Sequence, residues 1–520
     1  MRSRRRNAAA GAGRYGGHAE PRKARSPPQA GMRPDSESKF SIFSVTVTGS
    51  EGDVREEEDK LSEECGVFGI FSKDPDRDVA PLVYYGLFSL QHRGQESAGI
   101  AAARDGNIEC RKGMGLVGDV FNPETIGRLK GSAAIGHVRY STVGSSVIEN
   151  AQPFVSRFKL GSIAVAHNGT LTNADVVREL LEDAGTGFTS SSDSEVIVNL
   201  IAKNYKKGLE KALTDTIKFV KGSYALAVLT GDALVGARDP NGIRPLCLGS
   251  LDDGWILSSE SCAIDAVGGK FVRDIEPGEL VIITGDQLWS FVFSEKTRRA
   301  VCSFEHVYFA RPDSIIDGVD VYGSRIRAGE ILGRESAVVA DLVIGVPDSG
   351  VPAAIGYGRA TGTPFGLGIV KSKYVGRTFI SPDQAVREQA VSVKHNVIHR
   401  EVRDRRVVVI DDSIVRGTTS RRLVSVLRAA GAREVHFRVC SPPVRFPCYF
   451  GIDTPHRRDL ISNGNSVSDL CASLGADSLA FISVEGLLES LESPETGGRG
   501  GYCLGCFTGE YPIPVPGENG

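Results

Sequence analysis

The chain has 520 residues, of which 41% are hydrophobic, enough apolar material for two or three folded domains. Its formal net charge of −3 favours neither nucleic acid nor a membrane surface as a partner, and no apolar run approaches the ~18 residues that span a bilayer. Ten cysteines in so long a chain, without the pattern of a secretory leader, argue against a disulfide framework and indicate a cytoplasmic protein.

Residues 1–64 are predicted to remain unfolded as a leader. The first 25 residues carry eight Arg or Lys side chains and one acid, and an acid-rich run follows from Glu51 to Glu64. No apolar segment of a signal peptide follows the basic start. An organellar transit peptide fits this composition, and so does a mis-assigned start with Met32 as the first residue.

An apolar strand is predicted directly after the leader, over residues 65–71. For Cys65, at its start, the ordinary interpretation is a buried structural cysteine. Four polar motifs follow in order, LQHRGQESAG at 90–99, GHVRYST at 136–142, AHNGT at 166–170 and SSDSE at 191–195. Together with the strand, they resemble the glutaminase domain of the N-terminal-nucleophile amidotransferases. The resemblance implies that Cys65 becomes the first residue once the leader is removed.

The chemistry of an N-terminal cysteine explains why its position matters. An unperturbed thiol has a pKa of about 8.5 and an α-amino group one of about 7.7–8.0. A free α-amine on Cys65 can therefore accept the thiol proton, so that one residue supplies nucleophile and base. While the Glu64–Cys65 peptide bond is intact this base does not exist, and we expect no activity toward glutamine.

The other glutaminase roles follow from the motif match. The Asn168 side chain and the Gly169 N–H fit an oxyanion hole, which stabilises the charge that develops on an attacked amide. Arg139 fits the α-carboxylate of glutamine, and Asp193 fits its α-ammonium. Taken singly, an Arg or Asp is usually a surface charge and an Asn-Gly pair is usually a hairpin turn. The order of the four motifs favours the functional interpretation.

Residues 200–300 alternate apolar runs with Gly, Asp and Asn turns, a pattern typical of antiparallel strands. We expect a strand at 223–229 and a turn at 239–242. Cys247 and Cys262 are expected to be packing cysteines. The family resemblance implies that residues 65–300 form a four-layer αββα fold.

The stretch VVVIDDSIVRGTTS at 407–420 predicts a second site. Its four β-branched residues indicate a strand buried on both faces of a parallel sheet. An acid pair stands where the strand ends, and a glycine with three hydroxyl residues leads into an amphipathic helix that Gly431 closes. Such a turn binds phosphate through free N–H groups, and paired acids suit sugar hydroxyls or Mg²⁺. There is no Gly-Lys-Ser/Thr, so a nucleoside triphosphate is not the natural ligand.

This stretch resembles the 5-phosphoribosyl-1-pyrophosphate (PRPP) motif of type I phosphoribosyltransferases, which implies an α/β, Rossmann-like domain with a parallel sheet. The alternative is an ordinary strand, loop and helix whose acids are merely solvated. The resemblance implies that PRPP is bound by Asp411, Asp412, Gly417, Thr418 and Thr419.

Two further segments join this site by family match. Ser349, after a predicted strand at 341–344, would lie beside Asp411 and Asp412 around Mg²⁺; a Ser that caps the next helix is the alternative. The cation-rich run from 371 to 396 would close over pyrophosphate, with a solvated loop as the alternative. Its expected contacts are Lys373, Tyr374 and Arg377.

The C-terminus carries a C-x-x-C pair, Cys503 and Cys506. With two distant partners, such a pair suits a zinc site, an iron–sulfur cluster or a redox dithiol, and spacing does not separate zinc from iron. The resemblance does, because Cys302 and Cys448 stand in the contexts that, with this pair, ligate a structural [4Fe–4S] cluster in the iron–sulfur class of one amidotransferase family.

That family is the glutamine PRPP amidotransferases, and the resemblance covers about residues 65–510. It implies conversion of glutamine, PRPP and water to 5-phosphoribosylamine, glutamate and pyrophosphate, the first step of purine synthesis, with ammonia passed internally between two sites. It also implies a homotetramer inhibited by purine nucleotides. The expected divisions are a leader at 1–64, a glutaminase domain at 65–300, a phosphoribosyltransferase domain at 301–470 and a tail at 471–520.

Two other functions remain as alternatives. An asparagine or glucosamine-phosphate synthase shares the glutaminase half, but its second half is an ATP-pyrophosphatase or sugar-isomerase domain rather than the motif at 407–420. A DNA-binding, PRPP-sensing regulator reuses the phosphoribosyltransferase fold. The near-neutral charge, the lack of a helix-turn-helix signal and the full set of glutaminase motifs disfavour it.

Overall fold

The computed structural model describes residues 65–140, 146–285, 287–294, 298–372, 395–454, 456–492 and 501–515. The chain divides into two units, Met1–Arg55 and Glu56–Gly520, and every element below belongs to the second. The predicted leader and the predicted contacts Lys373, Tyr374 and Arg377 lie outside the described residues. No helix in the described part of the chain is long and apolar enough to cross a membrane.

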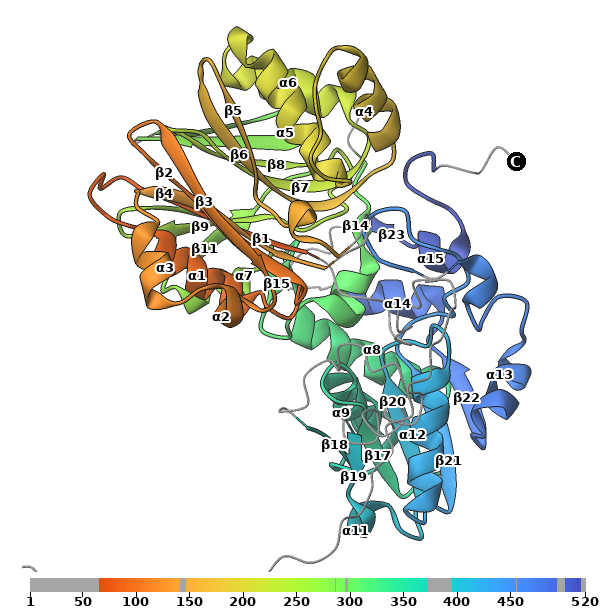
Figure 1. The fold of residues 1–520 in the computed structure, drawn as a ribbon. Coiled ribbons are helices and arrows are strands. Elements are labelled where there is room, and N and C mark those ends of the chain that lie inside the picture. Colours follow the sequence, from red (N-terminus) through yellow and green to blue (C-terminus); the bar gives the residue numbers. More distant parts are fainter. Residues whose placement is uncertain are drawn as a thin grey trace, which may run out of the picture. The chain divides into compact units, whose positions relative to one another are not determined.

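Two antiparallel sheets make up the first half of the unit (Figure 1). The seven-stranded sheet has the order β11-β9-β10-β1-β4-β2-β3, with β1 (Gly66–Ser72), β2 (Ser97–Arg104), β3 (Asn107–Met114), β4 (Ala133–Arg139), β9 (Cys247–Leu251), β10 (Gly254–Ser258) and β11 (Lys270–Asp274). The six-stranded sheet has the order β13-β12-β8-β7-β6-β5, with β5 (Phe154–Phe158), β6 (Gly161–Leu171), β7 (Gly222–Leu229), β8 (Leu234–Arg238), β12 (Glu279–Thr284) and β13 (Gln287–Val292). The predicted strands at 65–71 and 223–229 are thereby confirmed.

The sheets pack face to face through small side chains, among them Ala101, Ala164 and Ala227. Helices cover both outer faces. One layer contains α1 (Ala80–Ser89), α2 (Val117–Val120), α3 (Pro123–Arg128) and α7 (Ser261–Ala266), and the other α4 (Ala174–Asp183), α5 (Asp193–Asn204) and α6 (Leu209–Phe219), with short turns at Ile148–Asn150 and Tyr205–Lys207. The predicted αββα layering is confirmed, and Cys247 and Cys262 are buried packing residues.

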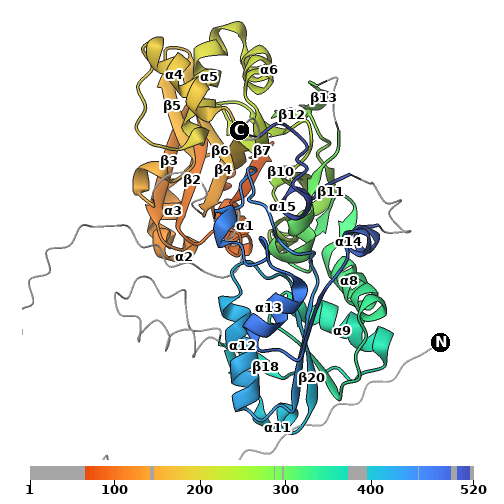
Figure 2. The same cartoon turned by 90° about the vertical axis from the view of Figure 1, so that its right-hand side faces the viewer.

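A four-stranded parallel sheet organises the second half, in the order β17-β20-β21-β22. Its elements are β17 (Leu342–Gly345), β20 (Arg406–Asp411), β21 (Glu434–Val439), β22 (Ser478–Phe481), α8 (Val321–Glu335), α9 (Gly350–Thr361), α11 (His399–Val402), α12 (Thr418–Ala429), α13 (Val467–Leu474) and α14 (Val484–Leu491). Figure 2 shows β20 between α12 and α9. The stretch predicted as the tail therefore supplies one strand, β22, to this sheet.

Strand β20 is buried on both faces, as its sequence predicted. Val407 and Val409 pack with the α12 side chains, whereas Val408 and Ile410 pack with α8 and α9. Gly431 follows α12 with φ +94°, so the predicted glycine end of this helix is also confirmed.

Short elements join the two halves. The π-helix η3 (Glu305–Phe309) follows β14 (Val301–Cys302), which pairs in parallel with β23 (Tyr502–Cys503), so the C-terminus returns to the junction. The remaining pieces are β15 (Ile315–Ile316) with β16 (Val319–Asp320), β18 (Ile369–Lys371) with β19 (His395–Val397), a turn at Arg457–Asp459, and α15 (Gly505–Thr508).

Candidate active site

Cys65 lies just before β1, and its backbone and thiol are both held. Its Sγ donates to the carbonyl oxygen of Tyr140 at 3.5 Å, and its own carbonyl accepts from Arg93 Nε at 3.0 Å. Burial raises the pKa of the thiol to about 11, against the opposing pull of the Arg139 charge. In the chain with residues 1–64 attached, the thiol is therefore protonated at neutral pH.

The two charged residues predicted to bind glutamine lie near this thiol. Arg139, at the end of β4, is buried and forms an ion pair with Glu96. Asp193 opens α5 and accepts the Leu171 N–H at 2.9 Å. The charges of Arg139, Glu96 and Asp193 all act on the Cys65 thiol. The structure thus brings both predicted glutamine-binding residues, Arg139 and Asp193, close to the Cys65 sulfur.

The Asn-Gly pair of this site is not a hairpin turn. Asn168 and Gly169 lie inside β6 and pair with β7. The Asn168 side-chain nitrogen is buried and has no hydrogen-bond partner among the described residues, the condition expected of a donor that waits for a ligand. Gly169 has φ +140°, and a Cβ there would lie 2.2 Å from the Ser223 carbonyl oxygen, so only glycine fits.

A buried polar network surrounds His167, the residue before Asn168, and the sequence patterns predicted no role for it. His137 Nε2 lies 3.0 Å from the His167 carbonyl oxygen, which connects the two sheets. His167 in turn contacts Ser194 Oγ at 2.9 Å, and its N–H donates to Gln152 Oε1 at 2.8 Å. Burial lowers the pKa of His137 to about 3, so the ring is neutral. The two histidines belong to the motifs at 136–142 and 166–170, but only the fold reveals their contact.

A second network, also missed, runs from Cys65 to the junction. Arg93 is fully buried and donates to Glu260 at 2.6 Å and to Glu305 at 2.7 Å, while its Nε holds the Cys65 carbonyl. Glu305 begins the π-helix that opens the second half. The backbone of the predicted nucleophile is therefore fixed by charges that belong to both halves.

The predicted partners of the acid pair also meet. Ser349 stands at the N-cap of α9, yet it makes no capping hydrogen bond, and its hydroxyl donates to Asp412 instead. Asp411 and Asp412 are each 1% exposed, and Ser413 Oγ donates to Asp412 at 2.8 Å. The interpretation of Ser349 as a helix cap and that of the acids as solvated are both wrong.

The turn after β20 has the geometry of a phosphate-binding loop. Gly417 has φ +80°, and a Cβ there would lie 2.4 Å from Ile461 Cδ1. Thr418 and Thr419 form the first turn of α12, where backbone N–H groups lack helical partners and the dipole favours an anion. The predicted sequence of strand, turn and helix is confirmed.

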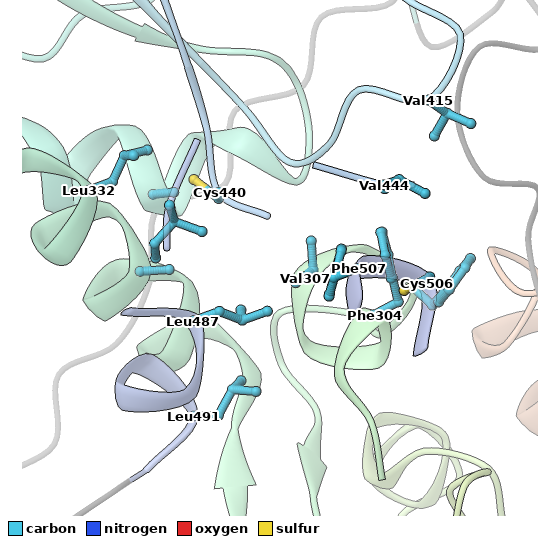
Figure 3. Packing of buried hydrophobic residues seen from close by; sticks show 14 of the residues in the cluster. Phe304, Val307, Leu332, Val415, Cys440, Val444, Leu487, Leu491, Cys506 and Phe507 are labelled. Atoms are coloured by element: carbon cyan, nitrogen blue, oxygen red, sulfur yellow. The ribbon is translucent and has the colours of Figure 1, made fainter. Parts of the chain in front are cut away.

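The four cysteines predicted as cluster ligands share one apolar cluster. Cys302 and Cys503 are paired by β14 and β23, Cys506 lies in α15, and Cys448 packs against the same side chains. Figure 3 shows Cys506 beside Phe304 and Phe507 of this cluster. Burial raises the pKa of Cys302 and of Cys503 to about 12. Within the described ranges, no three His, Cys, Asp or Glu side chains are close enough to hold one metal ion.

The fold and the two sites define a class: a glutamine amidotransferase joined to a phosphoribosyltransferase. Residues 137–266 match a family model described as a glutamine amidotransferase domain. The chain is 53% identical, over 457 residues, to the amidophosphoribosyltransferase of Archaeoglobus fulgidus, covering 87% of this chain and 99% of the relative. It is 47% identical, over 456 residues, to that of Bacillus subtilis, covering 88% and 95%.

A solved structure agrees with these relatives. Glutamine PRPP amidotransferase from B. subtilis, complexed with ADP and GMP, superimposes with a TM-score of 0.81 at 46% identity, covering 87% of this chain and 98% of that one. The chain belongs to the amidophosphoribosyltransferase family. It is a glutamine-dependent phosphoribosyltransferase that forms 5-phosphoribosylamine, glutamate and pyrophosphate from glutamine, PRPP and water, the first step of purine synthesis. The predicted family, fold class and reaction are confirmed, and the synthase and DNA-binding alternatives are wrong.

Proposed function

We propose that the two sites act as one coupled enzyme, in which ammonia released at Cys65 passes inside the protein to C1 of PRPP. The observation that supports this most is a direct contact between the second half and the strand pair β6–β7, in which β6 carries Asn168 and Gly169. Ser223 Oγ donates to the Phe450 carbonyl oxygen at 2.7 Å. Gly451 lies against Gly169: a Cβ built on Gly451 would be 3.2 Å from the Cα of Gly169. The second half is therefore packed directly against the strands of the glutaminase site, as the proposed coupling requires.

In the glutaminase half, Cys65 is the nucleophile. Removal of residues 1–64 frees its α-amine, which takes the thiol proton, and the thiolate attacks the amide carbon of glutamine. Asn168 and the Gly169 N–H stabilise the oxyanion. The carbon–nitrogen bond then breaks, ammonia leaves with the transferred proton, and water hydrolyses the thioester to glutamate. Arg139 holds the α-carboxylate and Asp193 the α-ammonium of the substrate.

In the other half, the turn at 417–419 holds the 5′-phosphate of PRPP through backbone N–H groups and the two threonine hydroxyls. Asp411 and Asp412 hold the ribose hydroxyls or Mg²⁺, with Ser349 beside them. Mg²⁺ takes one or two carboxylates together with substrate phosphates, so a protein site without three carboxylate or histidine ligands fits it. When bound, the ion neutralises charge on the departing pyrophosphate. Lys373, Tyr374 and Arg377 stay proposed pyrophosphate contacts outside the described residues.

A [4Fe–4S] cluster is proposed for the junction cysteines, Cys302, Cys448, Cys503 and Cys506. Four cysteines from three stretches of chain belong to one apolar cluster or pack against it, a setting that suits an iron–sulfur cluster. A cubane is larger than one ion, so its ligands stand farther apart than those of a single metal. The Phe450 N–H donates to Cys448 Sγ at 3.3 Å, a kind of contact that tunes such clusters. Its role is structural, since neither half-reaction moves electrons.

Further features are proposed from the family. The assembly is a cytoplasmic homotetramer inhibited by purine nucleotides; the B. subtilis relative was solved with ADP and GMP. The proposed divisions are the leader at 1–64, the glutaminase domain at 65–300, the phosphoribosyltransferase domain at 301–470 and the tail at 471–520, whose strand β22 completes the sheet of the preceding domain.

Two substitutions test whether glutamine hydrolysis and synthesis from PRPP take place at separate sites. Cys65→Ala should abolish glutamine-dependent synthesis, by at least about 10³-fold, and leave synthesis from added ammonia intact. Asp412→Asn should lower both routes while basal glutamine hydrolysis survives, and Asp404→Asn, at an exposed acid of the same half, should change neither. Loss of ammonia-dependent synthesis in Cys65→Ala would contradict separate sites.

Metal analysis tests the cluster. Anaerobically purified chain should contain iron and acid-labile sulfide in equal amounts, and Cys503→Ser should lose both. Cys471→Ser, at a half-buried cysteine on α13, is the matched control and should retain them. Stoichiometric zinc without sulfide would overturn the proposal.

A further inference from the structure

His306 is a buried imidazole whose ring nitrogens have no hydrogen-bond partner. The residue lies in the π-helix η3 and is 1% exposed. Neither Nδ1 nor Nε2 has a partner among the described residues. Its ring stands edge-on to Tyr502, with centroids 5.9 Å apart, and an aromatic face is at most a weak acceptor for one N–H. At least one nitrogen is therefore unsatisfied.

An unsatisfied buried polar group is costly, and in native proteins it usually marks a bound water or ligand. π-Helical turns are also rare and often occur at functional sites. The surroundings of His306 should therefore contain space for a small partner.

Such a space lies beside the ring. His306 lines a small pocket with room for a molecule the size of water and none for a substrate. Its apolar wall includes Val307, Leu487 and Leu491, labelled in Figure 3. Its polar wall includes Ser324, Arg325, Ser349, Asp412 and Ser490.

The other polar groups of this wall already have partners within the protein. Ser324 and Ser490 donate to backbone carbonyls at 2.9 and 2.6 Å, and Ser349 donates to Asp412. Arg325 donates to the carbonyl oxygens of His306 and Ala310 at 2.7 and 2.8 Å. Among these polar lining groups, the His306 imidazole is thus the one whose hydrogen bonds are unmade, so it can bind a small molecule in the pocket.

Hydrogen bonds and shared lining residues link this pocket to both reaction sites. The residue before His306 is Glu305, which holds Arg93 and, through it, the Cys65 carbonyl. The same lining includes Asp412 and Ser349, the proposed PRPP and Mg²⁺ site. His306 therefore shares a pocket with the site at which ammonia would react.

We propose that His306 binds ammonia by a hydrogen bond on its way from the glutaminase site to PRPP, and that water occupies the pocket between turnovers. This inference rests on the proposed internal transfer of ammonia and names one residue that receives it. Burial lowers the pKa of His306 to about 4, so the ring is neutral near pH 7 and does not protonate ammonia, which must keep its lone pair to attack C1.

The test uses the chain from Cys65 onward, with residues 1–64 removed. It compares His306→Phe, His306→Asn and the surface control His399→Phe. For each we would measure glutamate released, phosphoribosylamine trapped, and synthesis from added ammonium salt. Loss of one hydrogen bond corresponds to about a two- to tenfold change. His306→Phe should therefore release about two to ten times more ammonia to the medium per glutamate formed, with a matching fall in phosphoribosylamine made from glutamine, while glutamate release and synthesis from added ammonium salt change little.

The controls separate the explanations. His306→Asn, which keeps a hydrogen-bonding side chain, should recover most of the coupling, and His399→Phe should match the parent. Unchanged coupling in His306→Phe would overturn the proposal and leave the pocket with a structural water only. An equal fall in both synthetic routes would also overturn it, because the histidine would then support the PRPP site. A parent chain that forms no phosphoribosylamine from glutamine would refute the coupled function itself.

Discussion

The two sites of this molecule are built in different ways. In the glutaminase half the polar residues come from the interior of β6, the end of β4 and the start of α5. Their neighbourhood is held by the half-buried Glu96, which pairs with Arg139, and by the buried Gln152, which accepts the His167 N–H. In the phosphoribosyltransferase half, one continuous stretch supplies the acid pair, the turn and the helix N-terminus. The first site depends on how two sheets pack, whereas the second depends on one loop conformation.

This difference sets what each substitution should do. A change in the glutaminase site removes a positioned donor and affects only the glutamine route. A change in the loop at 417–419 strains or removes the phosphate-binding site and lowers synthesis from both glutamine and added ammonia, since both reactions use PRPP. Three predictions probe this contrast, from the largest expected effect to the smallest.

Loss of the oxyanion donor should have the largest effect. Asn168→Ala should lower the rate of glutamine hydrolysis by about 10²–10³-fold, the typical cost of one such donor, and should leave ammonia-dependent synthesis unchanged. Steady-state rates for both routes measure this, with Asn107→Ala, at an exposed residue of β3, as control. A fall in the ammonia route would show that the two sites are not separable.

The rate at which the Cys65 thiol is alkylated should depend on pH and on whether residues 1–64 are attached. With the Glu64–Cys65 bond intact, its pKa of about 11 keeps the thiolate fraction at pH 7.5 roughly 10²-fold below that of an ordinary thiol. Alkylation of Cys65, followed by mass spectrometry, should therefore be slow and should rise about tenfold per pH unit up to pH 10. Removal of the leader should accelerate it at pH 7.5. Fast, pH-independent alkylation of the intact chain would contradict this account.

Strain in the phosphate loop should have a smaller, specific effect. Gly417→Ala places a Cβ at φ +80° against Ile461, a cost of about 1–3 kcal/mol, so the KM for PRPP should rise roughly 5–150-fold. Gly464→Ala is the matched control, because Gly464 also has a positive φ but nothing within 4 Å of its Cβ position. An equal rise in the KM for PRPP in the two variants would show that Gly417 does not form part of the PRPP site.

The same contrast explains what the sequence could predict. The strand at 407–410, its two buried faces and the turn after it are encoded in consecutive residues, so pattern alone found them. The ion pairs of Arg93 with Glu260 and Glu305 were missed, since those partners lie 167 and 212 residues away. The burial of Asp411 and Asp412 depends on α8, α9 and the loop after β21, which no local pattern specifies.

The central claim is that the two halves form one coupled enzyme. The most direct measurement is glutamate release by processed, anaerobically purified chain, with and without PRPP and Mg²⁺, alongside phosphoribosylamine formation. The account predicts strong stimulation of glutamate release by PRPP and close to one phosphoribosylamine per glutamate. Glutamine hydrolysis that proceeds equally well without PRPP, with its ammonia lost to the medium, would contradict it.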